Sequence, residues 1–393
     1  MLKIYCFNLC LPQTRCMSLH TIIDFLQPIN IHELSNDEGY RNNQLGRNIP
    51  LYDEAFPELD EADIVLVGCG ETRGAGIGNY STAAPDAIRH EFYSLYHWHA
   101  NVKIADVGNV KPGATLADTY AALKAVVSEL IENKKRVVIL GGSHDVTLAQ
   151  YHAYGSLNKI IEVSCVDARI DLNMESPLPV DNFLMEMLTG EPNFIRHYNH
   201  LGFQSYFVHP QMLETIDKLR FDCYRVGKVK EGIEEMEPVI RNSNMLSFDI
   251  AAIQHAHAPA NRLTPNGFTG EEACILMQYT GMSPEMSSIG IYGYEPSKDT
   301  GALTAKQVSH MLWYLMDGVY RSKQEAPLSD RNEYNEFRMA FAEVEATFLQ
   351  SKRTGRWWMH MPDGRYIACS QYDYITAASN DIPERWMRAV ERS

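Results

Sequence analysis

The sequence lacks the cysteine spacing that disulfide scaffolds and zinc ribbons require. Its 393 residues contain eight cysteines, but no two of them form a CxxC pair or a dense framework. The cysteines are scattered along the chain at positions 6, 10, 16, 69, 165, 223, 274 and 369. Scattered cysteines of this kind are typical of reduced thiols. We therefore expect a cytoplasmic protein whose thiols are free and several of them buried.

Long apolar runs and excess positive charge are also absent. No apolar run approaches the roughly 20 residues that a membrane-spanning helix needs, so we expect no membrane association. The 35 Lys and Arg residues are outnumbered by 50 Asp and Glu residues, which gives a net charge of −15. Because binding along a nucleic-acid backbone needs clustered positive charge, we expect no nucleic-acid partner. Small molecules and other proteins are the partners left to consider.

What the sequence does contain is an alternation of strand-like and helix-like segments from residue 63 onward. This alternation is typical of a mostly parallel sheet with helices on both faces, a three-layer α/β fold of about eight strands. The predicted strands cover 63–69, 102–108, 136–142, 160–168, 204–209, 221–227, 244–250 and 287–294. The predicted helices cover 83–96, 115–133, 145–155, 211–219, 270–280 and 304–317.

The flanking segments depart from this alternation. Residues 1–16 carry three cysteines but no signal-peptide cleavage pattern, so we expect an extension outside the fold. Residues 17–62 are predicted to form an N-terminal helix followed by an irregular segment. Residues 63–320 form the predicted α/β domain. The remaining residues, 321–393, are predicted to form a small appendage with a helix near 333–346 and a β-hairpin.

Ligands of an open parallel sheet bind beyond the carboxyl ends of its strands, so polar residues after predicted strands are the first candidates. The glycine-rich segment 70–79 is one of them. However, Arg73 stands where a dinucleotide-binding GxGxxG loop needs its third glycine. A nucleotide site here is therefore an alternative to a flexible loop whose glycines permit tight turns.

Metal-ligating residue types follow three other predicted strands. His144 follows one strand, Asp167 and Asp171 flank the end of another, and Asp249 lies at the end of a third. Three carboxylates and an imidazole at one sheet edge form the oxygen-rich surroundings that Mn²⁺ prefers. The sequence therefore predicts one metal site formed by these four residues.

The segments around these residues resemble the signatures of the arginase, agmatinase and formimidoylglutamase family, the ureohydrolases. In that order, the family motifs GGxHD, DAHxD and SxDxDxxDPxxAP are similar to "GGSHD" (141–145), "DARID" (167–171) and "SFDIAAIQHAHAP" (247–259). Three further segments extend the resemblance to roughly residues 63–318, closest to the formimidoylglutamase branch: 73–93, 267–276 and 301–316. Chance similarity of all these segments in the family's order is improbable.

The resemblance implies an arginase-like fold, a symmetric homo-oligomer, and hydrolysis of a guanidino or formimino C–N bond by water activated between two Mn²⁺ ions. It also implies a first ion bound by His144, Asp167, Asp171 and Asp249, all of which are present. The second ion would share Asp167 and Asp249. The two residues that would bind the second ion alone have been replaced.

Arg169 stands in place of a family histidine, and Ala251 in place of an aspartate. Gly293 stands where the family has a substrate-recognising glutamate, and the nearby Glu295 is a candidate for that role. Three aspartates and one arginine leave two net negative charges, which one divalent ion balances. We therefore expect at most one Mn²⁺, with Arg169 as a permanent cation at the second position. Asp167, Arg169 and Asp249 are the candidate catalytic residues.

Two functions remain open at this point. The resemblance also implies a proton-transfer histidine after the second motif, as in arginases, and no histidine follows "DARID" here. Loss of the second ion, the substrate carboxylate and this histidine together favours a pseudoenzyme that binds a small amidine-like or guanidine-like ligand, or an unknown protein. The alternative is an active single-metal hydrolase of a linear amidine. His255 and His257 follow Asp249 closely and offer further metal ligands, although loop histidines are the simpler interpretation.

Overall fold

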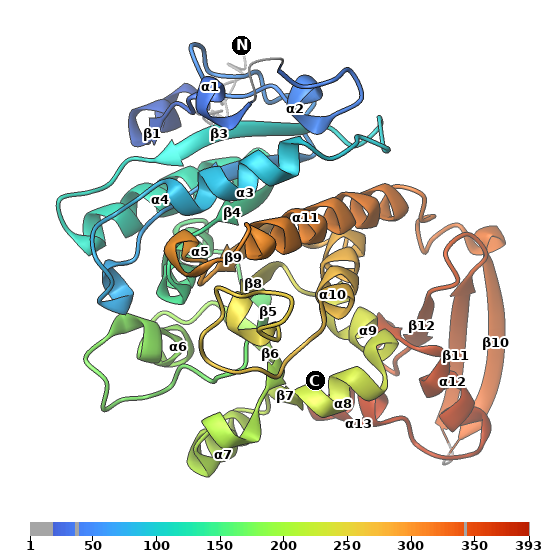
Figure 1. Cartoon of the computed structure of the whole chain (residues 1–393). Helices are drawn as coiled ribbons and strands as arrows, with labels where there is room; N and C mark the ends of the chain where they lie inside the picture. The colour runs from blue at the N-terminus through green and yellow to red at the C-terminus, as the bar shows by residue number, and fades with distance from the viewer. Residues whose placement is uncertain (1–18, 36–38, 342–343, 393) are drawn as a thin grey trace, which may run out of the picture.

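The apolar runs of the sequence form one nine-stranded sheet in the order β1-β3-β2-β4-β9-β8-β5-β6-β7 (Figure 1). The computed structural model describes residues 19–35, 39–341 and 344–392, so the predicted extension 1–16 lies outside the described residues. Neighbouring strands are parallel except at the short edge strand β1. The strands are β1 (Leu26–Gln27), β2 (Ile64–Gly68), β3 (Ile104–Val110), β4 (Arg136–Leu140), β5 (Ile161–Val166), β6 (Ile195–Phe203), β7 (Asp222–Arg225), β8 (Met245–Asp249) and β9 (Ser288–Tyr292).

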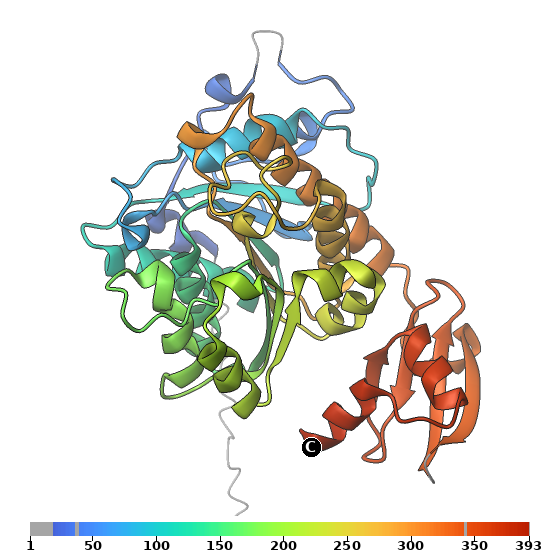
Figure 2. The same cartoon turned by 60° about the horizontal axis from the view of Figure 1, so that its bottom comes forward.

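Helices cover both faces of this sheet and enclose an apolar core on each, which confirms the three-layer α/β fold (Figures 1 and 2). One face is covered by α4 (Leu116–Glu132), α5 (Thr147–Ser156), α6 (Pro179–Thr189) and α7 (Pro210–Lys218). The other face is covered by α3 (Ala83–Tyr93), α8 (Val226–Glu231), α9 (Met236–Arg241), α10 (Gly270–Met282) and α11 (Leu303–Ser322), next to the short helices α1 (Ile31–Leu34) and α2 (Leu45–Asn48). Capping boxes at Thr115 and Thr269 begin α4 and α10, as their sequences favour.

A second, antiparallel sheet lies to one side of the main sheet, followed by two short helices (Figure 2). We call residues 334–391 the C-terminal unit. Its elements are β10 (Tyr334–Phe341), β11 (Val344–Ser351), β12 (Trp357–His360), β13 (Tyr366–Cys369), α12 (Gln371–Ala378) and α13 (Glu384–Glu391). It has its own small core, which includes Phe348, Met359 and Trp386. No helix in the described ranges is long and apolar enough to cross a membrane.

Two sequence-based assignments of elements were wrong. Residues 204–209, predicted as a strand, form a 3-10 turn after β6, whose own sequence was missed because it contains polar residues that are buried. The predicted helix at 333–346 is instead β10 and the start of β11, because Phe337, Met339 and Phe341 alternate toward one face. The N-terminal helix predicted after residue 17 is present as a 3-10 helix over Leu19–Phe25.

Candidate metal centre

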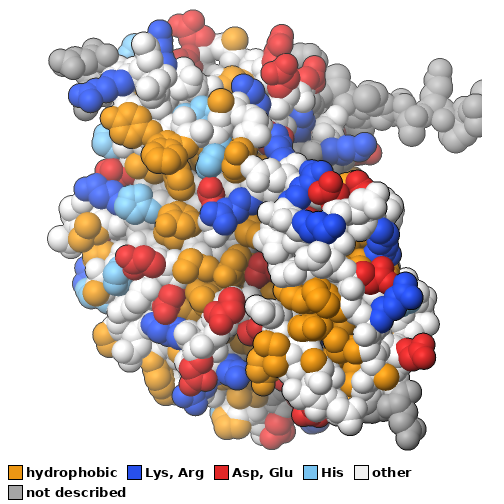
Figure 3. Space-filling view, turned by 90° about the vertical axis from the view of Figure 1, so that its right-hand side faces the viewer, with side chains coloured by type: hydrophobic (Ala, Val, Ile, Leu, Met, Phe, Trp, Pro, Cys, Tyr) orange, Lys and Arg blue, Asp and Glu red, His pale blue; other side chains and the backbone are white. Residues whose placement is uncertain are grey.

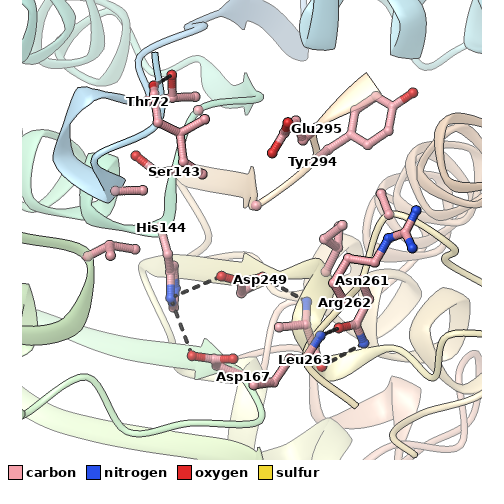
Figure 4. A pocket seen from close by; sticks show the side chains of 18 of the residues that line it. Thr72, Ser143, His144, Asp167, Asp249, Asn261, Arg262, Leu263, Tyr294 and Glu295 are labelled. Carbon is pink, nitrogen blue, oxygen red and sulfur yellow. Dashed lines mark hydrogen bonds and ion pairs between the residues drawn. The ribbon is translucent and has the colours of Figure 1, made fainter. Parts of the chain in front are cut away.

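Three neighbouring loops of the main sheet meet where the strands β4, β8 and β5 end (Figure 4). His144 begins a 3-10 helix shortly after β4, Asp167 directly follows β5, and Asp249 is the last residue of β8. Because parallel strands end at the same edge, residues that are far apart in the sequence come together here. Figure 4 shows the side chains of His144, Asp167 and Asp249 pointing toward one another.

One nitrogen of His144 faces three carboxylates. Its Nδ1 lies 2.9 Å from Asp171 Oδ2, 3.4 Å from Asp167 Oδ2 and 3.5 Å from Asp249 Oδ2. One ligand atom each from His144, Asp167 and Asp249 lies within 4.8 Å of the others, which is a suitable arrangement for one ion. The structure therefore brings together all four residues that the sequence singled out, with Asp171 against the imidazole.

The other nitrogen of His144 contacts a pair of hydroxyl groups. Its Nε2 lies 3.0 Å from Ser247 Oγ, which in turn lies 2.6 Å from Thr147 Oγ1. With a proton on Nε2 donated to Ser247, the Nδ1 lone pair is free for a metal ion. Sequence reasoning did not single out Ser247. Its position two residues before Asp249 on one strand, and so on the same face, was the available signal.

Burial and crowding of like charges shape the electrostatics of this site. Burial raises the pKa of Asp167, Asp171 and Asp249, and together with the neighbouring Asp167 carboxylate it brings the pKa of Asp249 to about 6. Burial lowers the pKa of His144, but hydrogen bonds to Asp167 and Asp171 outweigh this and hold it well above its usual value. The site thus favours positive charge at its centre.

The donor set fits a divalent cation. Asp167 Oδ1 is buried and has no hydrogen-bond partner in the described part of the chain, so a lone pair of this carboxylate is available. Carboxylate oxygens and one imidazole nitrogen are ligands that Mn²⁺ accepts. His144, Asp167, Asp171 and Asp249 are therefore the residues that would hold such an ion.

Two residues next to Asp249, Ala251 and Gly293, have no side-chain ligand to offer a second metal ion. The backbone N–H of Ala251 donates to Asp249 Oδ1 over 2.7 Å, while the alanine side chain offers no ligand. Gly293 has a positive φ of 80°, and a Cβ added there would lie 2.4 Å from Asp249 Oδ1. A side chain at position 293 would therefore displace the Asp249 carboxylate.

The expected position of Arg169 needs a correction. Its guanidinium does not lie between the aspartates: its Nη1 lies 3.7 Å from Asp181 Oδ1 of α6, and its side chain is 46% exposed. Burial of a guanidinium against the metal ligands would cost its hydration, whereas Asp181 offers a partner at the surface. From there its charge still lowers the pKa of Asp171 and Asp249.

A cavity of about 220 Å³ opens above the four ligand residues. Its walls include charged and polar side chains from several loops, among them Arg169, Asp181, Asn261, Arg262, Tyr294 and Lys298. Glu295 also lines it, and Figure 4 shows this residue across the cavity from His144. Its carboxylate is paired with Lys298 Nζ at 2.6 Å and accepts from Ser297 Oγ at 2.6 Å. A ligand at Glu295 would therefore compete with Lys298.

The two loop histidines after Asp249 do not join the centre. His255 Nδ1 lies 2.7 Å from the backbone oxygen of Asn261, which fixes the loop that carries it. Among the described residues, the group of possible metal ligands contains neither His255 nor His257. The five described cysteines are free, as expected, and four of them are buried: Cys69, Cys165, Cys274 and Cys369.

Comparisons with known proteins agree with this geometry. A sequence profile of the Arginase family matches residues 62–317. The formimidoylglutamase of Lysinibacillus sphaericus is 21% identical over 304 residues, which cover 74% of this chain and 94% of that protein. The formimidoylglutamase of Streptococcus gordonii is 23% identical over 289 residues, covering 67% of this chain and 87% of the relative.

Solved structures show the same fold. A formimidoylglutamase from Bacillus subtilis superposes with a TM-score of 0.63 at 18% identity, covering 71% of this chain and 93% of the other. A Mn²⁺-containing formiminoglutamase from Trypanosoma cruzi gives a TM-score of 0.63 at 16% identity, with 71% and 99% covered. Together with the order of the three motif segments along the sheet edge, these matches lead to one conclusion: the chain belongs to the arginase family.

Proposed function

We propose that this chain uses the arginase fold to bind one manganese ion and a small amidine-like or guanidine-like ligand, with C–N hydrolysis lost or greatly weakened. The observation that carries the proposal is the pair of contacts made by the two carboxylate oxygens of Asp249. One of its oxygens faces His144, and the other accepts a hydrogen bond from the backbone N–H of Ala251, a residue whose methyl side chain offers no metal ligand.

The residues of the centre have separate roles in this proposal. His144, Asp167, Asp171 and Asp249 hold the ion, and Ser247 orients the imidazole through its Nε2. A divalent ion bound there lowers the pKa of a coordinated water. The Ala251 N–H fixes Asp249 by holding one of its oxygens in place. No histidine is present at position 169 to complete a second site.

The open cavity supports a binding role. Its volume of about 220 Å³ suits a small metabolite rather than a polymer. A protonated amidine or guanidine is a planar cation whose N–H groups match carboxylate oxygens, which the cavity floor provides. The same cavity supports the second candidate, a single-metal hydrolase of a linear amidine, because a small substrate would reach the ligand residues.

Steady-state assays with Mn²⁺ distinguish the two candidates. The substrates are formimidoylglutamate, arginine, agmatine and guanidinobutyrate, with release of product followed over hours. We expect turnover at least about a thousandfold below a typical enzyme kcat of about 10 s⁻¹. A rate near that typical value with any of the four, abolished by Asp249→Asn, would contradict the binding role and support the hydrolase.

A further inference from the structure

The strand β10 forms the outer edge of the sheet in the C-terminal unit. It pairs with β11 along its whole length, from Tyr334 opposite Ser351 to Phe341 opposite Val344. In the described part of the chain, no strand pairs with its other edge, and Figure 1 shows β10 at the outside of the molecule. The strand thus presents an eight-residue edge to its surroundings.

The hydrogen-bond pattern tells which backbone groups face outward. The Lys352 N–H donates to the Glu333 carbonyl over 2.9 Å, so Glu333 faces β11. Because residues of an antiparallel strand alternate between facing toward and away from the partner, every second residue from Tyr334 faces away. These are Tyr334, Glu336, Arg338 and Ala340. The Tyr334 N–H donates to the Arg331 carbonyl, whereas within the described ranges the outward backbone groups of Glu336, Arg338 and Ala340 make no hydrogen bond across this edge.

This edge lacks several of the features that usually prevent pairing between edges, and its two exposed charges, Glu336 and Arg338, are of opposite sign. Exposed edge strands are commonly short, or interrupted by proline, a bulge or a lysine. The strand from Tyr334 to Phe341 contains no proline, glycine or lysine, and its register with β11 is continuous. Figure 3 looks onto this side of the molecule, where hydrophobic side chains are exposed between charged ones.

We propose that β10 pairs antiparallel with β10 of a second copy of this chain, about a two-fold axis through Phe337, to make a continuous eight-stranded sheet. In this register Glu336 lies opposite Arg338 of the second copy, and Arg338 opposite its Glu336. Both charges thereby gain a cross-strand partner of opposite sign. The outward N–H and C=O groups of both residues become hydrogen-bonded.

The charges select this register over the others. An axis through Glu336 would place two carboxylates opposite each other, and an axis through Arg338 would place two guanidinium groups together, which is unfavourable. In the free chain, Arg338 Nε pairs with Glu336 Oε1 at 2.6 Å, and its side chain is 82% exposed. Both side chains are thus available to exchange partners.

The aromatic residue on the axis is held in place by its own unit. The ring of Phe337 stacks on Trp357 with centroids 5.3 Å apart, and it also packs against Tyr374. Pairing places this ring next to its symmetry mate across the new strand pair. It covers apolar area that is half-exposed in one chain, so the interface gains both hydrogen bonds and hydrophobic contact.

Sedimentation of the full chain over a range of concentrations tests this interface. We expect the wild-type assembly to have twice the mass of Arg338→Glu, which places carboxylates opposite each other and raises the dissociation constant at least tenfold. The exchanged variant Glu336→Arg/Arg338→Glu restores the charge pairs and returns to within threefold of wild type. Lys159→Glu, an exposed charge reversal on the main domain, serves as the control and leaves the mass unchanged.

Either of two results would overturn the proposal. One is an equal mass for wild type and Arg338→Glu, which would mean that β10 does not join two copies. The other is failure of the exchanged variant to recover the wild-type mass, which would mean that these two residues do not face each other. Because both side chains are exposed, circular dichroism is expected to show the same fold for every variant.

Discussion

His144 is fixed on both sides of its ring. Ser247 contacts Nε2, and carboxylates surround Nδ1. Neighbours of this kind set the tautomer and orientation of a metal-binding histidine. The two residues at the second metal position offer no such support. The guanidinium of Arg169 lies near Asp181, and the side chain of Ala251 is a methyl group. At the scale of residues, the proposal of one ion rather than two therefore rests on positions 169 and 251.

Introducing both family ligand types tests whether these two residues alone limit the proposed centre to one ion. In the double variant Arg169→His/Ala251→Asp, we expect a second equivalent of Mn²⁺, because a cation is removed and a carboxylate is added. Metal content after dialysis measures this, and Arg169→Ala serves as the control that removes the charge without adding a ligand. A double variant that still binds no second ion would contradict this explanation.

At the scale of elements, ion pairs between a buried aspartate of the main sheet and two partly exposed arginines hold the C-terminal unit against that sheet. Asp222, at the start of β7, lies 2.5 Å from Arg388 and 2.5 Å from Arg392. Its other contact is His197 Nε2 at 3.0 Å. Burial raises the pKa of Asp222, but the hydrogen bond from His197 and the charge of Arg392 outweigh it and lower the pKa below its usual value.

This contact has a defined dependence on pH. Because the pKa of Asp222 is lower in the folded protein than in the unfolded chain, its stabilisation is present above about pH 4 and is lost as the pH falls through the folded value. We expect Asp222→Asn to lower the free energy of unfolding by about 1–2 kcal/mol at pH 7, discounted for the exposure of both arginines. Urea unfolding at several pH values measures it.

Asp60→Asn serves as the control for this pH dependence of the free energy of unfolding. The exposed Asp60→Asn is expected to change the free energy of unfolding by less than about 0.5 kcal/mol at any pH. The difference between wild type and Asp222→Asn is expected to shrink toward zero below the folded pKa, where the wild-type carboxyl is also neutral. A difference of the same size at pH 3 and pH 7 would show that the contact is not electrostatic.

At the scale of the whole molecule, local sequence patterns account for most elements but not for their arrangement. The β-branched runs of β2, β4 and β9 are visible in the sequence, whereas the pairing of β4 with β9 joins residues about 150 positions apart. The order of the motif segments, and their resemblance to the family, supplied that arrangement. The polar strand β6 was missed because His197 and Asn199 are buried only when Asp222 is beside them.

The candidate metal centre, too, could be predicted only in part from local sequence patterns. The sequence could single out its four candidate ligand residues because each lies at or shortly after the end of a strand of the parallel sheet. The position of Arg169 was not, since its partner Asp181 lies on α6, a helix that the sequence analysis did not identify. Side-chain direction at the edge of a cavity depends on neighbours that only the folded chain brings together.

The central claim is that the centre holds one ion. The most direct measurement is the Mn²⁺ content of the wild-type chain after saturation and dialysis, with Asp249→Asn as the control that removes a ligand. We predict about one equivalent per chain, reduced to near zero in Asp249→Asn. Two equivalents in the wild type, both lost in that variant, would contradict the claim.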